Sequence, residues 1–591
     1  MKKYHYTVER NVQILLYLLK AHNIRKIVAS PGTTNITFIA SAQQDPFFEI
    51  YSCVDERSAA YIACGLAEES GEAVVISCTG ATASRNYIPA LTEAFYRKIP
   101  VLAVTATQEI SKIGNMVPQV IDRRQQLNDI VKISEHIGVV TDRISEDDAA
   151  LKINRVILEL FHHGKGPAHI NLTTTYSRDY SVEKLPKARV INRFLYDSIL
   201  PEMGKKCRVA IFIGAHSTFN QSLTEAVDAF CRIHDAVVFC DHTSGYHGAF
   251  RVPFSIVNSQ DQIYSQMNII DVLIHIGEIS GDYPEMKLNP KEVWRVSEDG
   301  CLRDLFHSLK YVFEMSEQVF FNHYSQGLID DNGCFFLEEC ISEVENVRNN
   351  IPELPFSNVW IAQNTAGKIP DNSVLHLGIL NTLRCWNMFD INPSVQVASN
   401  TGGFGIDGGL SALIGASLAR PNVLHFMVIG DLSLFYDMNV LGNRHIGKNV
   451  RILLINNGKG TEFRMYSHPG FQFGDQTDEF IAAGRHFGNK SNFLVKHFAE
   501  DLGFDYLTAS DKDTYLKNVT LFLNGNSIDK PVIFEVFTES ELESQALQMI
   551  CNIVVKPEEP ISNTMKVKGA IKKVLGNKGV EIVKKAKEII S

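Results

Sequence analysis

An acid and an amide follow two apolar runs in the segment 427–460. The run 427–429 stops at Gly430 and Asp431, and the run 452–455 stops at Asn457 after one further asparagine. A parallel strand needs a crossover of a dozen or more residues, and the chain between the runs is long enough to supply one as a helix. Both side chains would then reach the same carboxyl edge of a sheet, where ligands bind.

Carboxylate and amide oxygens are hard ligands, and together with phosphate oxygens and water they complete a Mg²⁺ site. The two strand ends therefore predict a diphosphate held through a metal ion. The alternative is that Gly-Asp and Asn-Asn are ordinary strand-ending turns.

Two other stretches could lie at a ligand. The segment 399–419 is dense in glycine and alanine, which predicts a loop that passes close to a ligand and then a closely packed helix. Glu56 follows a predicted strand and begins an alanine-rich helix. Because a carboxylate is favourable at a helix N-terminus, simple capping is the alternative to a chemical role for Glu56.

Short β-rich apolar runs alternate with helical stretches along most of the chain, which indicates α/β domains with parallel sheets. Changes in this pattern predict the boundaries 1–183, 184–340, 341–555 and 556–591. The first and third parts share a rhythm of strand, acid and small-residue helix. The second part lacks a G-x-G-x-x-G motif, so we expect no NAD or FAD there.

The last part, 556–591, is basic, because residues 565–591 hold eight lysines and two glutamates. Its apolar residues fall at helical spacing and predict two short amphipathic helices. These helices could dock on an acidic face of a subunit, or attach weakly to an anionic membrane surface.

The composition excludes several classes of protein. A net charge of −10 disfavours nucleic acid as the main partner. The eleven cysteines contain no C-x-x-C pair and favour a reducing compartment. The start of the chain has apolar residues on one helical face and no cleavage site, and no apolar run approaches the ~18 residues of a membrane span. We therefore expect a cytoplasmic protein.

Taken together, several motifs resemble the thiamine-diphosphate-dependent decarboxylase and carboligase superfamily. They are the spaced Gly-Asp and Asn-Asn pairs, "DERSAAYIACGLA" at 55–67, "SPGTTN" at 30–35 and "GPAHINL" at 166–172. The resemblance covers about residues 5–545. Within it, "SNTGGFGIDGGLS" and "GDLSLFYDMN" are most similar to the menaquinone-pathway SEPHCHC synthases, which join decarboxylated 2-oxoglutarate to isochorismate.

The resemblance implies thiamine diphosphate and Mg²⁺ as cofactors, with a pyrimidine-binding first domain, a central Rossmann-like domain and a diphosphate-binding third domain. It also implies that the pyrimidine and the diphosphate are held by different subunits, so the protein would be a homodimer or a dimer of dimers. The implied metal ligands are the side chains of Asp431 and Asn457 and the backbone carbonyl of Lys459. The family usually has glycine at the last position, so the Lys459 side chain must point away.

The family also implies which residues contact the cofactor and the reacting centre. Glu56 would hydrogen-bond the pyrimidine, and Ile406 would hold the cofactor in a bent shape unless it is a core residue. Gln119 would reach the reacting centre unless it is an ordinary loop amide, and His468 could move protons in a lid over 461–476. The other implied cofactor-binding residues are Gly405, Gly430, Leu432, Ser433 and Gly460.

The substrate half departs from the synthases. Positions where that family has basic residues carry Thr34, Thr401 and the pair Asp282-Tyr283, and only Arg384 is retained. Each lost charge-assisted contact would cost about 1.5–3 kcal/mol of binding to a poly-anionic substrate.

The replacements are polar, together with Thr33 and with Glu462 at a usually apolar position. They favour a carboligase that decarboxylates a small 2-oxo acid and transfers the resulting unit to a hydroxyl-rich acceptor, such as a sugar or nucleotide sugar. A simple decarboxylase and a true SEPHCHC synthase are the alternatives. A non-catalytic binding module is disfavoured, because Glu56 and both metal-ligating side chains are present.

Overall fold

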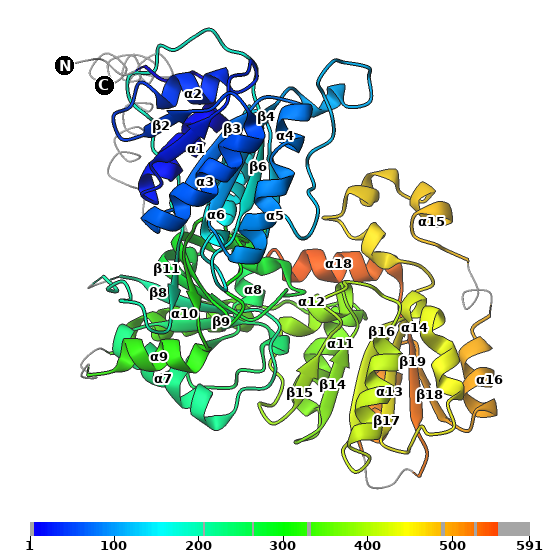
Figure 1. Cartoon of the computed structure of the whole chain (residues 1–591). Coiled ribbons are helices and arrows are strands. Elements are labelled where there is room, and N and C mark those ends of the chain that lie inside the picture. Colours follow the sequence, from blue (N-terminus) through cyan, green and yellow to red (C-terminus); the bar gives the residue numbers. More distant parts are fainter. Residues whose placement is uncertain are drawn as a thin grey trace, which may run out of the picture. The chain divides into compact units, whose positions relative to one another are not determined.

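The computed structural model describes residues 5–204, 207–262, 265–327, 333–485, 491–524 and 529–553. The chain divides into two compact units, Met1–Gly204 with Lys291–Phe320, and Lys205–Pro290 with Phe321–Ser591. Three parallel β-sheets are present and confirm the predicted α/β class (Figure 1). The four boundaries predicted from sequence stay a prediction, and the predicted helices of 556–591 lie outside the described residues.

The first sheet has the strand order β2-β1-β3-β4-β6-β5, and its pairings are parallel. The strands are β1 (Lys26–Ala29), β2 (Glu49–Ser52), β3 (Val74–Cys78), β4 (Val101–Thr107), β5 (Ser134–Ile137) and β6 (Ala168–Thr173). The helices are α1 (Arg10–Ala21), α2 (Ile36–Ala42), α3 (Glu56–Ser70), α4 (Thr82–Arg85), α5 (Ile88–Arg97) and α6 (Arg143–Glu159).

Alternation along the strands explains the two layers of helices around this sheet. Successive strand side chains point to opposite faces. Accordingly, Ile27 and Val75 pack in one core with α1 and α6, whereas Val28 and Val74 pack in another with α3 and α5. A strand buried on both faces is mostly apolar, which is why these strands form short apolar runs in the sequence.

The second sheet has seven strands in the order β10-β9-β8-β11-β12-β13-β7. They are β7 (Asn192–Leu195), β8 (Val209–Ile213), β9 (Val237–Cys240), β10 (Arg251–Val252), β11 (Ile269–Ile276), β12 (Asn289–Val296) and β13 (Leu309–Glu314). The α-helices of this region are α7 (Gln221–His234), α8 (Ser255–Asn258), α9 (Glu317–Ser325) and α10 (Phe335–Asn349).

The third sheet has the order β15-β14-β16-β17-β19-β18, again with parallel pairings. Its strands are β14 (Val374–Leu377), β15 (Gln396–Ala398), β16 (His425–Gly430), β17 (Val450–Asn456), β18 (Asp505–Ala509) and β19 (Val532–Phe537). Its helices are α11 (Asn358–Thr365), α12 (Asn381–Asn387), α13 (Gly409–Ala419), α14 (Asp431–Asp437), α15 (Gln476–Phe480), α16 (Leu494–Asp501), α17 (Lys512–Leu523) and α18 (Ser540–Ile550). Strands β16 and β17 are parallel neighbours, as predicted.

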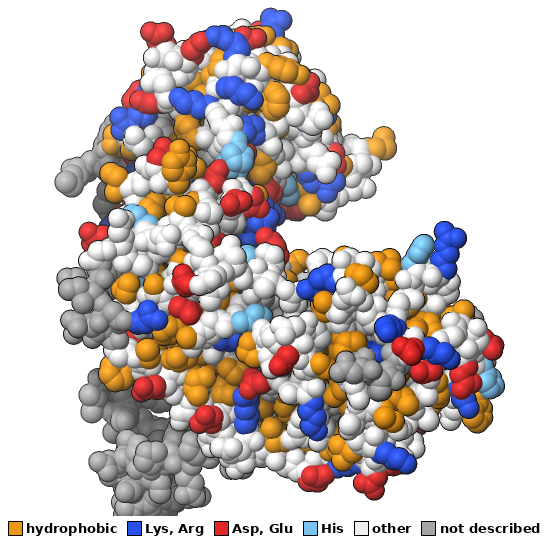
Figure 2. Space-filling model, turned by 90° about the horizontal axis from the view of Figure 1, so that it is seen from below, with side chains coloured by type: hydrophobic (Ala, Val, Ile, Leu, Met, Phe, Trp, Pro, Cys, Tyr) orange, Lys and Arg blue, Asp and Glu red, His pale blue; other side chains and the backbone are white. Residues whose placement is uncertain are grey.

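The surface mixes both signs of charge. On the face shown in Figure 2, lysine and arginine side chains are interspersed with aspartate and glutamate side chains. Within the part of the chain that the structure describes, none of the helices combines the length and apolar character needed to cross a bilayer.

Candidate active site

The ends of β16 and β17 are joined through the Asp431 side chain. Gly430 is in register with Ile455, so both strands end at the same edge of the sheet. Asp431 is buried, and its Oδ2 accepts a hydrogen bond of 2.8 Å from the Gly458 N–H while its Oδ1 accepts one of 2.8 Å from the Leu432 N–H. The carboxylate at the end of one strand therefore lies against the loop that follows the other.

Burial makes this position favourable for a cation. Burial raises the pKa of Asp431 to about 7, and the nearby Glu535 carboxyl adds to the rise. A positive ion beside the carboxylate would oppose both effects and lower the pKa again. The structure thus places a carboxyl that gains from a bound cation at the predicted metal position.

The two other implied metal ligands lie on the loop after β17. The Asn457 side chain hydrogen-bonds to the buried Glu543 carboxyl. The Lys459 Nζ lies 2.7 Å from Asp478 Oδ2 on α15, so the ammonium group has a partner of its own. The Lys459 carbonyl accepts a hydrogen bond of 2.9 Å from the Thr461 N–H.

A small pocket opens beside α14 and contains several residues of the glycine-rich segment. Its lining is His376, Leu377, Gly378, Ile379, Ser399, Asn400, Gly405, Gly409, Met427 and Ser433. Ser433 Oγ donates a hydrogen bond of 2.5 Å to the Ile406 carbonyl, which fixes the loop to the helix. Ser399 Oγ is buried and has no hydrogen-bond partner among the described residues. A buried hydroxyl without a partner indicates a polar ligand at this pocket.

Glu56 is the first residue of α3, but it does not cap the helix. Asp55 is the N-cap, and its side chain accepts hydrogen bonds from the N–H groups of Arg57 and Ser58. Asp55 therefore supplies the N-cap hydrogen bonds. Glu56 lies in the first turn of the helix, where a carboxylate is favourable, so the alternative to a chemical role stays open. The half-buried Glu56 carboxylate accepts a hydrogen bond of 3.4 Å from Asn86 Nδ2. Glu56 belongs to the first unit and Asp431 to the second.

Gln119 is exposed and lies in a loop with a positive φ of 64°. A Cβ on Gly80 would come within 2.7 Å of the Gln119 carbonyl oxygen. The close approach of the Gln119 loop therefore requires glycine at position 80.

Arg384 is already neutralised in the predicted substrate region. Its Nη1 donates a hydrogen bond of 2.7 Å to Glu462 Oε1, and its guanidinium lies 4.1 Å from the centre of the Tyr283 ring. Both charged side chains are mostly buried, at 20% and 18% exposure. Three of the predicted site residues, Arg384, Glu462 and Tyr283, are therefore in contact.

The predicted threonines differ in their surroundings. Thr34 is buried, and its hydroxyl donates to the Ala106 carbonyl at 3.0 Å. Thr401 is also buried, whereas Thr33 is exposed. Thr34 therefore holds the backbone together, and its hydroxyl already has an acceptor.

His468 has a local role in its turn. Its Nδ1 accepts a hydrogen bond of 2.9 Å from the Gly470 N–H, and its ring packs edge-on against Phe463 with 5.2 Å between centroids.

Gly460 allows the Ala482 carbonyl oxygen to come close to the backbone, because a Cβ at position 460 would lie within 3.2 Å of that oxygen.

Sequence reasoning missed a cluster of buried acids next to Tyr283. Asp282 is fully buried, and its Oδ2 accepts a hydrogen bond of 2.6 Å from the Ser255 hydroxyl. Burial, with the neighbouring Asp241 charge, raises the pKa of Asp282 to about 7. Burial, with the Asp282 charge, raises the pKa of Glu285 to about 9. Asp282 thus points into the protein, and no local pattern distinguishes it from an exposed turn residue.

Asp282→Asn is expected to stabilise the protein at alkaline pH. The pKa of Asp282 is raised from 3.8 to about 7 in the folded protein, so the charged side chain lowers the free energy of unfolding. This loss is absent below pH 3.8 and complete above pH 7. We expect a gain of about 1–4 kcal/mol at pH 8 and a smaller gain at pH 5. Urea unfolding at both pH values measures it, with the exposed Asp501→Asn as a control. An equal effect at both pH values would contradict the assignment.

Comparison with known proteins places this site in a family. Residues 10–129 match the family described as "Thiamine pyrophosphate enzyme, N-terminal TPP binding domain". The 2-succinyl-5-enolpyruvyl-6-hydroxy-3-cyclohexene-1-carboxylate synthase of Bacteroides fragilis is 31% identical over 566 residues, which are 92% of this chain and 98% of the relative. The synthase of the same name from Phocaeicola vulgatus is 30% identical over 563 residues, with the same coverage.

A solved structure is also similar, the thiamine diphosphate-dependent 4-hydroxybenzoylformate decarboxylase of Rhodococcus jostii RHA1. Its TM-score is 0.38 at 17% identity, and the match covers 90% of this chain and 99% of that one.

The family match and the relatives define a thiamine-diphosphate enzyme that acts on 2-oxo acids. Within this class, the chain belongs to the family of the 2-succinyl-5-enolpyruvyl-6-hydroxy-3-cyclohexene-1-carboxylate (SEPHCHC) synthases.

The residues present fit this cofactor. The buried Asp431 carboxylate suits the usual Mg²⁺ partner, and the unpartnered Ser399 hydroxyl suits the diphosphate. When bound, thiamine diphosphate supplies a nucleophilic carbon and an electron sink for decarboxylation. The chain supplies the anchor and the electrostatic environment.

Proposed function

We propose that this enzyme is a carboligase that decarboxylates a small 2-oxo acid and transfers the resulting acyl unit to a hydroxyl-rich acceptor, such as a sugar or nucleotide sugar. One observation carries the proposal. Arg384, the basic residue that is retained in the substrate half, is paired with Glu462 at 2.7 Å and stacked on Tyr283. The pair has no net charge, so it offers little attraction to a poly-anionic acceptor.

The rest of the substrate half supports the same proposal. Thr401 and Tyr283 stand where the synthases carry basic side chains, and Asp282 is buried next to Tyr283. Thr34 is a third such replacement, but its buried hydroxyl already donates to the Ala106 carbonyl. The hydroxyls of Thr401 and Tyr283 can exchange hydrogen bonds with sugar hydroxyls, and the carboxylate of Glu462 can accept them. A small donor such as pyruvate carries one carboxylate. A guanidinium N–H of Arg384 that Glu462 does not take can still donate a hydrogen bond to it, although the pair has no net charge.

Two other activities compete with this proposal. SEPHCHC synthesis is favoured by the relatives that carry this name and align over 98% of their length. Plain decarboxylation needs only the cofactor half of the site.

We further propose that Glu56 of one subunit faces Asp431 of the other, so that a homodimer is the smallest active form.

The test is CO₂ release with thiamine diphosphate, Mg²⁺ and a panel of 2-oxo acids, with and without acceptors. We expect pyruvate to be turned over faster than 2-oxoglutarate, with release that depends on a sugar or nucleotide-sugar acceptor. Release from pyruvate that is equally fast without an acceptor would establish a decarboxylase instead. Efficient turnover of 2-oxoglutarate with isochorismate would establish a SEPHCHC synthase.

Glu462→Gln is expected to shift the donor preference. Removing the carboxylate frees the Arg384 guanidinium for a second carboxylate on the substrate, and a charge-assisted contact is worth about 1.5–3 kcal/mol. The ratio of kcat/KM for 2-oxoglutarate to that for pyruvate should rise about tenfold or more. Glu479→Gln, an exposed change on α15, is the control. An unchanged ratio would show that Arg384 does not contact the donor.

A further inference from the structure

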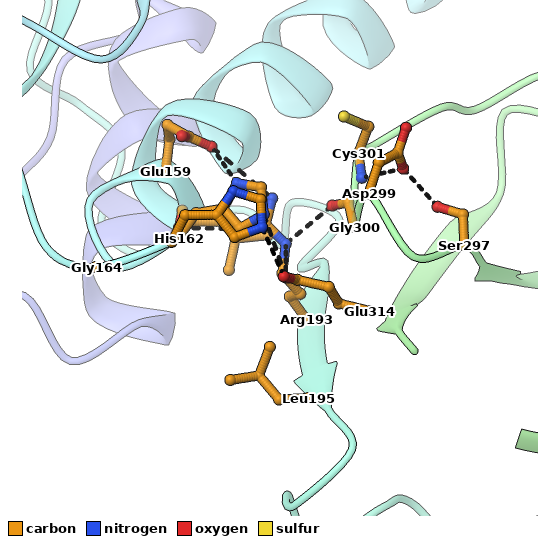
Figure 3. Close-up of polar contacts among 12 residues, drawn as sticks. Glu159, His162, Gly164, Arg193, Leu195, Ser297, Asp299, Gly300, Cys301 and Glu314 are labelled. Atoms are coloured by element: carbon orange, nitrogen blue, oxygen red, sulfur yellow. Dashed lines mark hydrogen bonds and ion pairs between the residues drawn. The ribbon is translucent and has the colours of Figure 1, made fainter. Parts of the chain in front are cut away.

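Two histidines and two glutamates meet in the first unit, where the chain leaves α6 (Figure 3). His162 Nδ1 lies 2.9 Å from Glu159 Oε2, and His162 Nε2 lies 3.2 Å from Glu314 Oε2 at the end of β13. His163 Nε2 lies 2.9 Å from Glu314 Oε1, and the two imidazole rings stack with 3.8 Å between centroids. We call these four side chains the two-histidine cluster.

When His162 is neutral, two hydrogen-bond acceptors face each other, His162 Nε2 and Glu314 Oε2. A neutral imidazole has one N–H donor and one acceptor nitrogen. Because the Glu159 carboxylate can only accept, Nδ1 carries the hydrogen and Nε2 presents a lone pair to Glu314. Neither His162 Nε2 nor Glu314 Oε2 has a hydrogen-bond partner among the described residues, and His162 is only 9% exposed. Two buried acceptors at 3.2 Å repel each other unless a proton or a cation lies at this position.

The Arg193 guanidinium lies beside the same two glutamates, with Nη2 4.0 Å from Glu159 Oε2. Arg193 cannot bridge the acceptors itself, because its Nε donates to the Gly300 carbonyl at 3.0 Å and lies 3.9 Å from Glu314 Oε2. Figure 3 shows Arg193 turned toward both Gly300 and Glu314. A metal cation at this position would satisfy both atoms.

We propose that His162, His163 and Glu314 bind a divalent transition-metal ion of the Zn²⁺ class. Zinc bonds of about 2.0–2.2 Å in a tetrahedral site place neighbouring ligand atoms about 3.3 Å apart. His162 Nε2 lies 3.2 Å from Glu314 Oε2 and His163 Nε2 lies 2.9 Å from Glu314 Oε1, and both distances are near that value. One ligand atom from each of the three residues can be chosen so that all lie within 4.8 Å of one another. Imidazole nitrogen selects Zn²⁺ over Mg²⁺, so this ion is distinct from the one used with the cofactor.

The surrounding side chains match this role. A metal-bound histidine almost always donates its other N–H to a carboxylate or carbonyl, as His162 does to Glu159. The His163 side chain is 66% exposed, which leaves an entry path and a fourth position for water. Lys132 Nζ lies 3.5 Å from Glu159 Oε1, and with Arg193 it balances the two carboxylates, so binding is weaker than at a site without cations. The ion ties the end of α6 to β13.

Metal titration of the full-length enzyme, loaded with thiamine diphosphate and Mg²⁺ and freed of trace metals, tests the proposal. Co²⁺ serves as a visible-absorbing probe for Zn²⁺. We expect one Co²⁺ per chain with the intense visible bands of a tetrahedral site, and displacement by Zn²⁺. His163→Asn and Glu314→Gln should each weaken the affinity at least about tenfold. Asparagine suits position 163, because the backbone there has a positive φ of 42°. His445→Asn, at an exposed histidine, is the matched control.

Several results would overturn the proposal. One is an affinity that His163→Asn leaves unchanged, since that exposed side chain can be replaced without disturbing the core. Another is a thiolate charge-transfer band in the Co²⁺ spectrum, which would assign the ion to a cysteine such as the exposed Cys301. A third is the absence of binding to the wild-type chain. Zn²⁺ should also raise the Tm of the wild type and not of His163→Asn, and an equal rise in both would count against the site.

Discussion

Asp431→Asn should lower the affinity for thiamine diphosphate in the presence of Mg²⁺ at least about 100-fold, because changes one shell outside a metal site already cost 10–100-fold. The substitution removes the negative charge next to the cation. It also leaves one of the two N–H donors, on Leu432 or Gly458, without its acceptor. Calorimetric titration of the cofactor with Mg²⁺ in excess measures the loss, and CO₂ release should fall below detection.

A second aspartate on the same helix provides the control. Asp437 is also buried, and it accepts hydrogen bonds of 2.6 Å from the N–H and the hydroxyl of Ser411 on α13. Asp437→Asn should lower the Tm while leaving cofactor affinity unchanged. If Asp431→Asn bound the cofactor as tightly as Asp437→Asn, Asp431 would not be a metal ligand.

Glu56→Gln should lower kcat by about 100- to 10,000-fold, the range that general acid–base groups contribute. Glutamine keeps the size and the ability to hydrogen-bond, but it cannot hold the charge that stabilises a proton on its partner. Cofactor affinity should change by less than about tenfold, because one hydrogen bond is at stake. Steady-state CO₂ release and cofactor titration separate the two effects.

The matched control for Glu56 lies on the same helix. Glu69→Gln changes an exposed carboxylate of α3 and should leave both kcat and affinity unaltered. Asp55 stays in place as the N-cap in both variants, so helix stability is the same. A loss of cofactor binding equal to the loss of kcat in Glu56→Gln would point to an anchoring role rather than a chemical one.

Strands that are buried on both faces could be predicted from the sequence, and edge strands could not. The segments that became β3, β4, β16, β17 and β19 are mostly apolar, with single interruptions such as Glu535, because helices cover both sides of a parallel sheet. By contrast, β5 reads Ser-Glu-His-Ile and lies at the edge of the first sheet, so nothing in its pattern distinguishes it from a loop. The residues of β7 are all at least partly exposed, so its pattern does not distinguish it from a loop either.

The site shows the same division between local and distant information. The link between Asp431 and Gly458 followed from the rule that neighbouring parallel strands end together. The ion pair of Arg384 with Glu462 joins residues 78 positions apart, and only the fold brings them into contact. The burial of Asp282 is equally a product of packing, since its sequence neighbours Gly281 and Tyr283 are typical of an exposed turn.

Mixing two inactive variants tests the central claim that Glu56 of one subunit and Asp431 of another form one active site. After subunit exchange, Glu56→Gln and Asp431→Asn chains form hybrid dimers, in which one site holds both substitutions and the other holds neither. CO₂ release with a turned-over 2-oxo acid should then recover to about a quarter of the wild-type rate, because half of the dimers are hybrids and each has one intact site. No recovery in a mixture shown to contain hybrid dimers would contradict a site shared between subunits.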